Sequence, residues 1–214
     1  SFRELGQNHP AVKSIGNRLI PLSRYCDIYL VDKFFTWTNE LIPNKFKDLT
    51  NDHPRMVIPF RDADGKVFAY QGRAFGEEQP KYITIVLDQN NQKIFGLDRV
   101  DDNRNIIIVE GPLDSLFLPN CIAVAQGDLR LPQYKTKSTL VFDNEPRNRE
   151  IIKNIEKAID EDYNVVIWPS EIEEKDINDM IISGLTNVEI TDIIHRNTFS
   201  GLQAKTQLSH WKKI

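Results

Sequence analysis

The chain has 214 residues, of which 40% are hydrophobic and 27% charged, and its formal net charge is −4. That length suffices for one large domain or two small ones. No apolar run is long enough to cross a bilayer and no secretory signal pattern is present, so membrane insertion is not expected. The two cysteines lack a CxxC spacing and the four histidines are scattered, which argues against a zinc site.

Charge is divided unevenly along the chain. The first 100 residues hold 14 Lys and Arg against 12 Asp and Glu, while the remainder holds 13 against 19. A mildly basic first part and an acidic second part would suit a module that faces nucleic acid or nucleotides, joined to one that binds a metal. The bias is small and decides nothing on its own.

Residues 1–50 are predicted to be mostly helical. Pro is tolerated in the first turn of a helix, so a helix is expected to start at His9–Lys13. The segment Cys26–Val31 has the composition of a β-strand, and Phe34–Trp37 is a dense aromatic cluster. Core packing is the favoured interpretation of that cluster. The alternative is a surface on which nucleic-acid bases stack.

Residues 55–97 are predicted to form β-strands. Met56–Phe60 and Val67–Tyr70 flank an Asp-Gly turn, which predicts a hairpin. Ile83–Leu87 and Gln92–Leu97 suggest a further pair of strands around a second turn, Asp-Gln-Asn-Asn.

Several cations accompany these strands. Arg73 and Lys81 lie beyond the second strand, near one end of the expected sheet, and Arg55 and Arg61 are weaker candidates in the same region. A solvated surface charge is the ordinary interpretation of each. The functional alternative is a contact with the template or with nucleotide phosphates.

The second half of the chain contains two apolar runs that end in carboxylates. The first, Ile106–Val109, is a continuous β-branched run, which is typical of a strand buried on both faces of a parallel sheet. Glu110 follows it directly. A helix is expected to start at Pro112, with Asp114 in its first turn.

The second run, Leu140–Phe142, delivers Asp143 and Glu145 in the same way. Ligands of open α/β sheets gather beyond the carboxyl ends of the strands, so these acids are expected to meet Glu110 and Asp114. Carboxylates are hard oxygen ligands, suited above all to Mg²⁺, with Mn²⁺ as an alternative. Each motif alone could be a solvated loop, but the two in this order predict a functional acidic site.

The remaining segments alternate between strands and helices. A strand at 122–125 leads into Gln126–Asp128, where Asp128 is a loop acid or a further member of the acidic site. Amphipathic spacing predicts a helix at Arg147–Asp160, followed by a fourth strand at 165–168.

An acid-rich run, Glu171–Asp179, comes next, and most of its acids are expected to be solvated. Asp176 is a good N-cap before Ile177. A further helix is predicted at Asn187–His195, and the tail Gly201–Ile214 is predicted to be an amphipathic helix or a docking segment.

Two motifs together resemble the TOPRIM domain of primases, topoisomerases and some nucleases: VEGPLD at 109–114 and VFDNEP at 141–146. Upstream, the segments 55–75, 80–82 and 96–97 resemble the basic subdomain that precedes TOPRIM in bacterial-type replicative primases. The primases of large tailed phages are the nearest match, because DNEP replaces the usual DxD there.

This resemblance implies an α/β fold, in which an α+β N-terminal subdomain precedes a mostly parallel TOPRIM-like sheet flanked by helices. The expected domains are an N-terminal primase-core subdomain at 1–100, TOPRIM at 101–185 and a C-terminal helical tail at 186–214. The implied activity is that of a DNA primase catalytic core, a DNA-directed RNA polymerase and nucleotidyltransferase. Such an enzyme makes short RNA primers on single-stranded DNA from ribonucleoside triphosphates, with two Mg²⁺ ions.

The resemblance also implies roles for the acids. Asp143, Glu145 and one of Asp176 and Asp179 would hold the metal ions. Glu110 would be a metal ligand or the general base. The second acid of the DxD pair is here Glu145, whose longer side chain can still bind Mg²⁺ with a shifted metal geometry.

Further roles follow for the other candidates. Asp114 would assist or orient the reacting groups. Arg73 and Lys81 would hold the triphosphate or the template, with Arg55 as a weaker candidate.

A replicative helicase partner is implied as well, together with a cytoplasmic location, in a host cell if the chain is phage-encoded. A chain that starts at Ser1 without Met has the form of an excerpt or a processed product. An upstream zinc-binding module that recognises the start site on the template is therefore expected outside it.

Three alternatives stay open. A TOPRIM nuclease would use the same acids with water as the nucleophile, and it would not need Arg73 and Lys81. A topoisomerase fragment would need a nucleophilic Tyr on a separate domain. The third alternative is a non-catalytic module that binds nucleic acid or organises a replisome.

Overall fold

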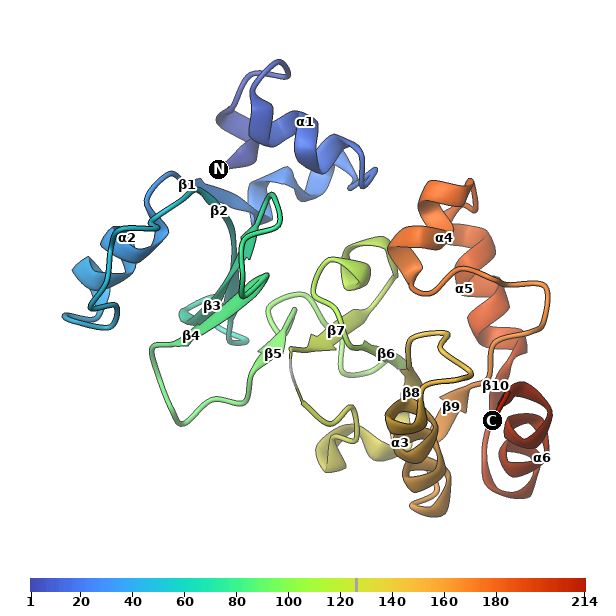
Figure 1. The fold of residues 1–214 in the computed structure, drawn as a ribbon. Helices are drawn as coiled ribbons and strands as arrows, with labels where there is room; N and C mark the ends of the chain where they lie inside the picture. The colour runs from blue at the N-terminus through green and yellow to red at the C-terminus, as the bar shows by residue number, and fades with distance from the viewer. Residues whose placement is uncertain (126) are drawn as a thin grey trace. The chain divides into compact units, whose positions relative to one another are not determined.

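The computed structural model describes residues 1–125 and 127–214 and divides the chain into two compact units, Ser1–Gln92 and Lys93–Ile214 (Figure 1). The second unit begins earlier than the boundary predicted at residue 100, and it includes the tail predicted as a separate segment. Gln126, which was expected to follow a strand, lies outside the described residues. No helix in the described ranges is both long and apolar enough to cross a bilayer.

The first unit is an α+β arrangement around an antiparallel sheet with the strand order β1-β2-β3-β4. Its strands are β1 (Tyr29–Val31), β2 (Arg55–Arg61), β3 (Val67–Ala74) and β4 (Tyr82–Val86). Its helices are α1 (Pro10–Gly16) and α2 (Phe34–Leu41), with the short 3-10 helices η1 (Phe2–Glu4) and η2 (Leu22–Asp27). The helix start predicted at His9–Lys13 is confirmed, because His9 caps α1 and its Nδ1 accepts the Ala11 N–H.

The hairpin between β2 and β3 forms at the Asp-Gly turn, as predicted. Asp62 Oδ1 accepts hydrogen bonds from the N–H groups of Asp64 and Lys66, at N···O distances of 3.1 and 2.9 Å. Gly65 has a φ of +80°, a left-handed conformation that glycine adopts without strain.

The predicted pairing of the next two strands with each other is wrong. Strand β4 pairs with β3, whereas β5 (Ile94–Phe95) pairs with β7 (Cys121–Val124) of the second unit's sheet. A hydrophobic pattern identifies a strand without specifying its partner, so the turn between the two runs was over-interpreted as a hairpin.

The aromatic cluster of α2 belongs to the core of the first unit. Phe34 is fully buried, and its ring centroid lies 6.0 Å from that of Tyr70 and 6.4 Å from that of Trp37. Gly72 of β3 lies directly against this ring, since a Cβ added there would be 2.3 Å from Phe34 Cε2. Core packing is therefore confirmed for Phe34, while Phe35 and Trp37 are only partly buried.

The second unit is built on a six-stranded sheet with the order β10-β9-β8-β6-β7-β5. The strands not yet introduced are β6 (Ile106–Val109), β8 (Ser138–Val141), β9 (Asn164–Val166) and β10 (Thr198–Phe199). The four central strands are parallel, and β5 and β10 pair antiparallel at the two edges. The predicted mostly parallel sheet is confirmed.

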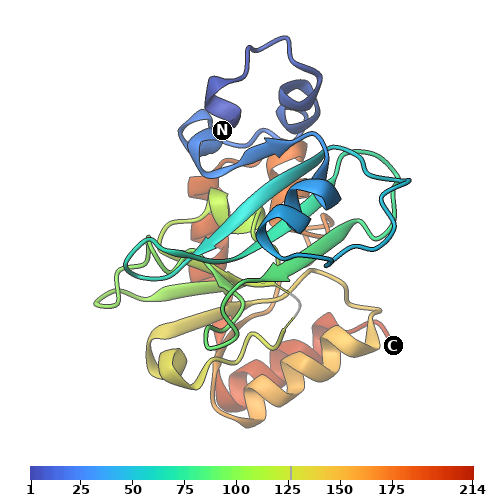
Figure 2. The same ribbon diagram turned by 90° about the vertical axis from the view of Figure 1, so that its left-hand side faces the viewer.

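Helices cover this sheet on both faces. They are α3 (Arg149–Asp160), α4 (Ile177–Ser183), α5 (Asn187–Arg196), α6 (Gly201–Trp211) and the 3-10 helices η3 (Asp114–Phe117) and η4 (Pro132–Lys137). Helices α3 and α6 lie side by side in both views (Figures 1 and 2). Ile106 and Ile108 of β6 share a core cluster with Ile155 of α3 and Leu208 of α6. The intervening Ile107 is buried as well, as expected for a strand covered on both faces.

The contact between Phe34 and Gly72 predicts that Gly72→Ala destabilises the first unit by about 1 to 3 kcal/mol, the usual cost of forcing atoms into a packed core. Native-state hydrogen exchange of the β2 and β3 amides is the measurement, because it reports on this unit alone.

The matched control is Gly16→Ala at the end of α1, where an added Cβ meets no atom within 4 Å. This variant should retain wild-type protection. Equal protection in Gly72→Ala and the wild type would contradict the packing described.

Candidate metal centre

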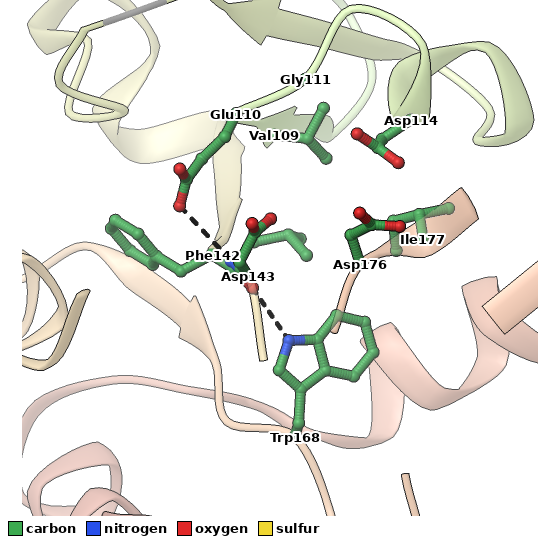
Figure 3. Close-up of a pocket in the computed structure, with 10 residues that line it drawn as sticks. Val109, Glu110, Gly111, Asp114, Phe142, Asp143, Trp168, Asp176 and Ile177 are labelled. Carbon is green, nitrogen blue, oxygen red and sulfur yellow. Dashed lines mark hydrogen bonds between the residues drawn. The ribbon is translucent and has the colours of Figure 1, made fainter. Parts of the chain in front are cut away.

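The two carboxylate-bearing strands end at the same edge of the six-stranded sheet. Strands β6 and β8 are parallel neighbours in which Val109 pairs with Val141, so the residues that follow leave the sheet together. Glu110 comes directly after Val109, and Asp143 lies two residues beyond Val141, where this pairing ends. The backbone N–H of Asp143 donates to Glu110 Oε1 at an N···O distance of 3.4 Å (Figure 3). The structure thus brings these two predicted site residues together.

Asp114 joins them by turning back over Gly111. A Cβ added at Gly111 would overlap Asp114 Oδ2, so any larger residue there would displace this carboxylate. Asp114 Oδ1 accepts the backbone N–H of Asn178 at 3.0 Å, in the first turn of α4. This bond ties the loop after β6 to the helix that carries the next acid.

Asp176 and Asp179 differ in where their side chains lie. Asp176 is the N-cap of α4, as predicted, and its Oδ1 accepts the Asp179 N–H at 2.8 Å. Its side chain also lines the same pocket as Glu110 and Asp143. Asp179 is exposed and is not among the residues that line this pocket.

The pocket at the strand ends is small and acidic. Its volume is about 10 Å³, which is room for about one water molecule or a bare ion. Figure 3 shows the carboxyl groups of Asp114, Asp143 and Asp176 facing one another, with Glu110 beside Asp143. The lining residues are Val109, Glu110, Gly111, Asp114, Val141, Phe142, Asp143, Trp168, Asp176 and Ile177.

Burial and neighbouring charges make ionisation of Asp143 and Glu110 unfavourable. Burial, together with the neighbouring charges of Glu110 and Asp114, raises the pKa of Asp143 to about 7. Burial also raises the pKa of Glu110, against the lowering effect of the hydrogen bond from the Asp143 N–H. Carboxyl groups that repel one another in a partly dry site are relieved by a cation.

A lysine supplies part of that positive charge. Lys175 Nζ lies 3.1 Å from Glu145 Oε1 and 3.8 Å from Asp143 Oδ2, while its own side chain is half exposed. Burial works to raise the pKa of Glu145, but hydrogen bonds from Asn148 and Lys175 lower it overall. Glu145 therefore stands at the rim of the site as a stable carboxylate.

A divalent cation fits this set of groups, because carboxylate oxygens are the hard donors that Mg²⁺ and Mn²⁺ prefer. Within the described residues, no three His, Cys, Asp or Glu side chains converge closely enough to hold an ion by themselves. Mg²⁺ needs fewer protein ligands than that, since it keeps several waters and is bound through one or two carboxylates plus substrate phosphates. Asp143, Glu110 and Asp176 are the residues best placed to hold it.

The predicted cations lie in the first unit and differ in exposure. Arg55 is fully buried, and its Nη1 donates to the carbonyl oxygens of Gly72 and Lys81 at 3.1 and 3.3 Å. Arg73 is 6% exposed, and its Nε donates to the Tyr82 hydroxyl at 3.0 Å. Lys81 is exposed. Arg55 thus holds both ends of the connection between β3 and β4, and of the three only Lys81 projects its charge into solvent.

Sequence analysis did not single out three residues at the acidic site. Lys175 is the one cation within the run Glu171–Asp179. It directly precedes the N-cap Asp176, and this position was a signal that it lies near the site. Asn144 stands between two predicted metal ligands, which was also a usable signal. Trp168 donates its indole N–H to the Phe142 carbonyl at 2.9 Å, a contact that no sequence pattern indicates.

The fold is that of a primase catalytic core. The structure of the Aquifex aeolicus primase, comprising its zinc-binding and RNA polymerase domains, matches with a TM-score of 0.69 at 19% identity, covering 98% of this chain and 62% of that one. A DnaG primase catalytic domain bound to single-stranded DNA matches with a TM-score of 0.64 at 14% identity, covering 90% of this chain and 74% of that one. At these identities the likeness establishes the fold.

Sequence comparison establishes the relationship. The DNA primase of Enterobacteria phage T4 is 37% identical over 216 residues, which cover 99% of this chain and 63% of that protein. No protein-family model matches the chain. The chain is thus similar to this DNA primase over nearly its whole length, in agreement with its motifs, and it spans somewhat less than two thirds of the phage relative.

The raised pKa of Asp143 predicts that Asp143→Asn stabilises the metal-free protein at pH 8. The folded-state pKa of about 7 exceeds the ordinary value of 3.8, so the folded protein holds a proton that the unfolded chain releases between these values. Wild-type stability therefore falls as the pH rises from 3.8 to about 7, a loss that asparagine avoids.

Thermal unfolding midpoints in a chelating buffer between pH 4 and pH 8 provide the measurement. The unfolding midpoint of Asp143→Asn should exceed that of the wild type by an amount that increases with pH. A constant difference across this range would count against the raised pKa.

Proposed function

We propose that this chain is the catalytic core of a DNA primase, which makes short RNA primers on single-stranded DNA from ribonucleoside triphosphates. The observation that carries the proposal is the partly buried pocket of four acids at the ends of β6 and β8, in a chain similar to a DNA primase over nearly its whole length. The reaction joins two nucleotides by attack of a 3′-hydroxyl on an α-phosphate, with pyrophosphate as the leaving group. It is a nucleotidyl transfer that needs negative charge to be neutralised and a proton to be removed.

In this proposal Asp143 and Asp176 hold Mg²⁺ or Mn²⁺ in the pocket, and Glu145 contributes from the rim. When bound, such ions supply charge neutralisation at the attacking and leaving oxygens. Lys175, which already pairs with Glu145, adds a positive charge at the same rim. The protein therefore contributes to catalysis a set of fixed charges that are in place before the substrate binds.

Glu110 is proposed as the general base. Its Oε1 accepts the Asp143 N–H, so Oε2 is the oxygen that takes the proton of the 3′-hydroxyl. Burial raises its pKa, which makes the carboxylate a stronger base than an exposed one. Asp114 is proposed to orient α4, and with it Asp176, through its hydrogen bond to the Asn178 N–H.

In the first unit, Lys81 is proposed as the contact with template or nucleotide phosphates, because its charge is exposed. Arg55 and Arg73 are proposed to support the connection that carries Lys81. A replicative helicase and a zinc-binding module remain proposed partners. The Aquifex structure includes a zinc-binding domain, and a module of that kind is proposed to direct this core to its start site.

Asp143→Ala is expected to reduce primer synthesis by at least about a hundredfold, since it removes a group that holds the metal. The assay follows Mg²⁺- or Mn²⁺-dependent incorporation of labelled ribonucleotides on single-stranded DNA of mixed sequence. The matched control is Asp179→Ala, because Asp179 belongs to α4 but does not line the pocket. It should retain near wild-type synthesis.

Degradation of the template without primers, lost in Asp143→Ala, would assign the site to a nuclease and overturn the proposal. Equal losses in Asp143→Ala and Asp179→Ala would overturn the assignment of Asp176 over Asp179. Where the wild type alone gives no product, the assay is repeated with a zinc-binding module supplied. If there is still no product, the pocket is not a primase active site. The chain would then be a non-catalytic module.

Lys81→Ala is expected to weaken binding to single-stranded DNA and to reduce the slope of log K against log salt by about 0.7, the share of one phosphate contact. Fluorescence anisotropy at several salt concentrations measures this slope. Lys66→Ala is the matched control, since Lys66 is an exposed lysine of the same unit in the β2–β3 turn. The same change of slope in both variants would mean that Lys81 makes no particular contact.

A further inference from the structure

Asn144 lies between the two acids Asp143 and Glu145 and is nearly fully buried. Its Nδ2 donates to the carbonyl oxygens of Ile172 and Glu174, at N···O distances of 2.9 and 3.0 Å. Its backbone N–H donates to the Lys175 carbonyl at 2.7 Å. Asn144 therefore joins the loop of the DNEP motif to the segment that precedes Asp176.

The remaining polar atom of this side chain is held by the C-terminal helix. Asn144 Oδ1 accepts the indole N–H of Trp211, the last residue of α6, at 3.0 Å. Two residues later the backbone N–H of Lys213 donates to the Pro146 carbonyl at 2.8 Å. The end of α6 thus contacts the DNEP loop at two points.

Helix α6 is itself anchored on the rest of the unit. Leu208 is buried in the core cluster that includes Ile155 of α3, and Lys212 Nζ lies 3.2 Å from Glu156 Oε1. The position of Trp211 is therefore fixed by the packing of α6 against the core and by its ion pair with α3. A fixed donor on an anchored helix can hold a loop in place.

A second indole, that of Trp168, contacts the same loop from the segment that follows β9. Trp168 donates to the Phe142 carbonyl, so indole N–H groups hold the chain on both sides of Asp143 (Figure 3 shows the Trp168 bond). The side chain of Asn144 uses both of its donors and accepts one bond. Burial of a polar side chain is tolerated because of this, and alanine or glycine could not make these bonds.

We propose that Trp211 and Asn144 are a positioning pair for the metal centre. Trp211 fixes Asn144, which sets the directions of Asp143 and Glu145 and places the segment that brings Lys175 and Asp176 to them. The inference rests on the proposed function, in that it takes the acidic pocket to bind a divalent cation. It assigns a role in that binding to the C-terminal helix, which was predicted from the sequence as an amphipathic helix or a docking segment.

The reason for positioning is the arrangement of the ligands. The acids come from three separate segments of the chain, and a metal ion or a transferring phosphate tolerates only small errors in where they stand. Groups that orient metal ligands through hydrogen bonds change metal affinity by about 10- to 100-fold when they are removed.

The test is Trp211→Phe, which keeps an aromatic ring and removes only the N–H donor. The dissociation constant for Mn²⁺, measured by electron paramagnetic resonance on the isolated protein, is expected to rise about tenfold. Asn144→Ala should raise it at least as much. Adding Trp211→Phe to Asn144→Ala should cause no further change, because the two residues act through one hydrogen bond.

Ile94→Ala is the control for stability. Ile94 is buried on the edge strand β5, which pairs with β7, so the substitution leaves α6 and every group that bonds Asn144 in place. It should lower the unfolding temperature while leaving Mn²⁺ affinity within about twofold of the wild type. Wild-type affinity in Trp211→Phe would overturn the proposal. Equal weakening in Ile94→Ala and Trp211→Phe would also overturn it, because the effect would then follow from general loosening.

The Mn²⁺ measurement separates this inference from the proposed function. Binding that is lost in Asp143→Asn and weakened in Trp211→Phe supports the positioning pair even if no primers are made. Primer synthesis by a Trp211→Phe protein with unchanged Mn²⁺ affinity refutes the pair and leaves the primase proposal standing. A wild-type protein that binds no Mn²⁺ refutes the pair, because there is then no metal centre to position.

Discussion

Glu110 and Asp143 are held at the ends of adjacent parallel strands, and their mutual repulsion in a partly buried pocket is the constraint on which the site depends. Strand register keeps their backbones close together. Burial is the main reason that the pKa values of both groups are raised, and the charge of Glu110 raises that of Asp143 further. Positive charge from Lys175 relieves part of it, and a divalent cation would relieve more.

The surrounding structure is arranged to keep this unfavourable group of charges in place. Gly111 lets Asp114 fold back into the pocket, and Asp114 in turn holds the start of α4. Asp176 caps the same helix while it lines the pocket. Each of these acids is fixed by a hydrogen bond to a backbone N–H. Hydrogen bonds to the first turn of α4 thereby hold these two acids in place.

The strand ends and most of the pocket acids could be predicted, because short sequence patterns specify them. A β-branched run followed by Glu-Gly, and an apolar run followed by Asp-Asn-Glu, located the strand ends and most of the pocket acids. The role of Asn144 was not predicted, because its side chain bonds residues 28 and 67 positions away in the sequence, and no local pattern specifies such partners. The burial of Arg55 was not predicted for a related reason. Its guanidinium contacts Phe34 of α2 and the Lys81 carbonyl before β4, both distant in the sequence. The pairing of β5 with β7 likewise depends on a contact between distant segments.

The six-stranded sheet ends at each side in a strand of only two residues, β5 and β10. An open edge normally offers a row of unpaired N–H and C=O groups to any extended chain nearby, and this invites aggregation. Here an added strand could pair with only two edge residues at either side of the sheet. Polymerisation by sheet extension is thereby discouraged for this unit, even though its central strands are among the most apolar segments of the chain. Association with other proteins would have to use helices and loops instead of the sheet margins.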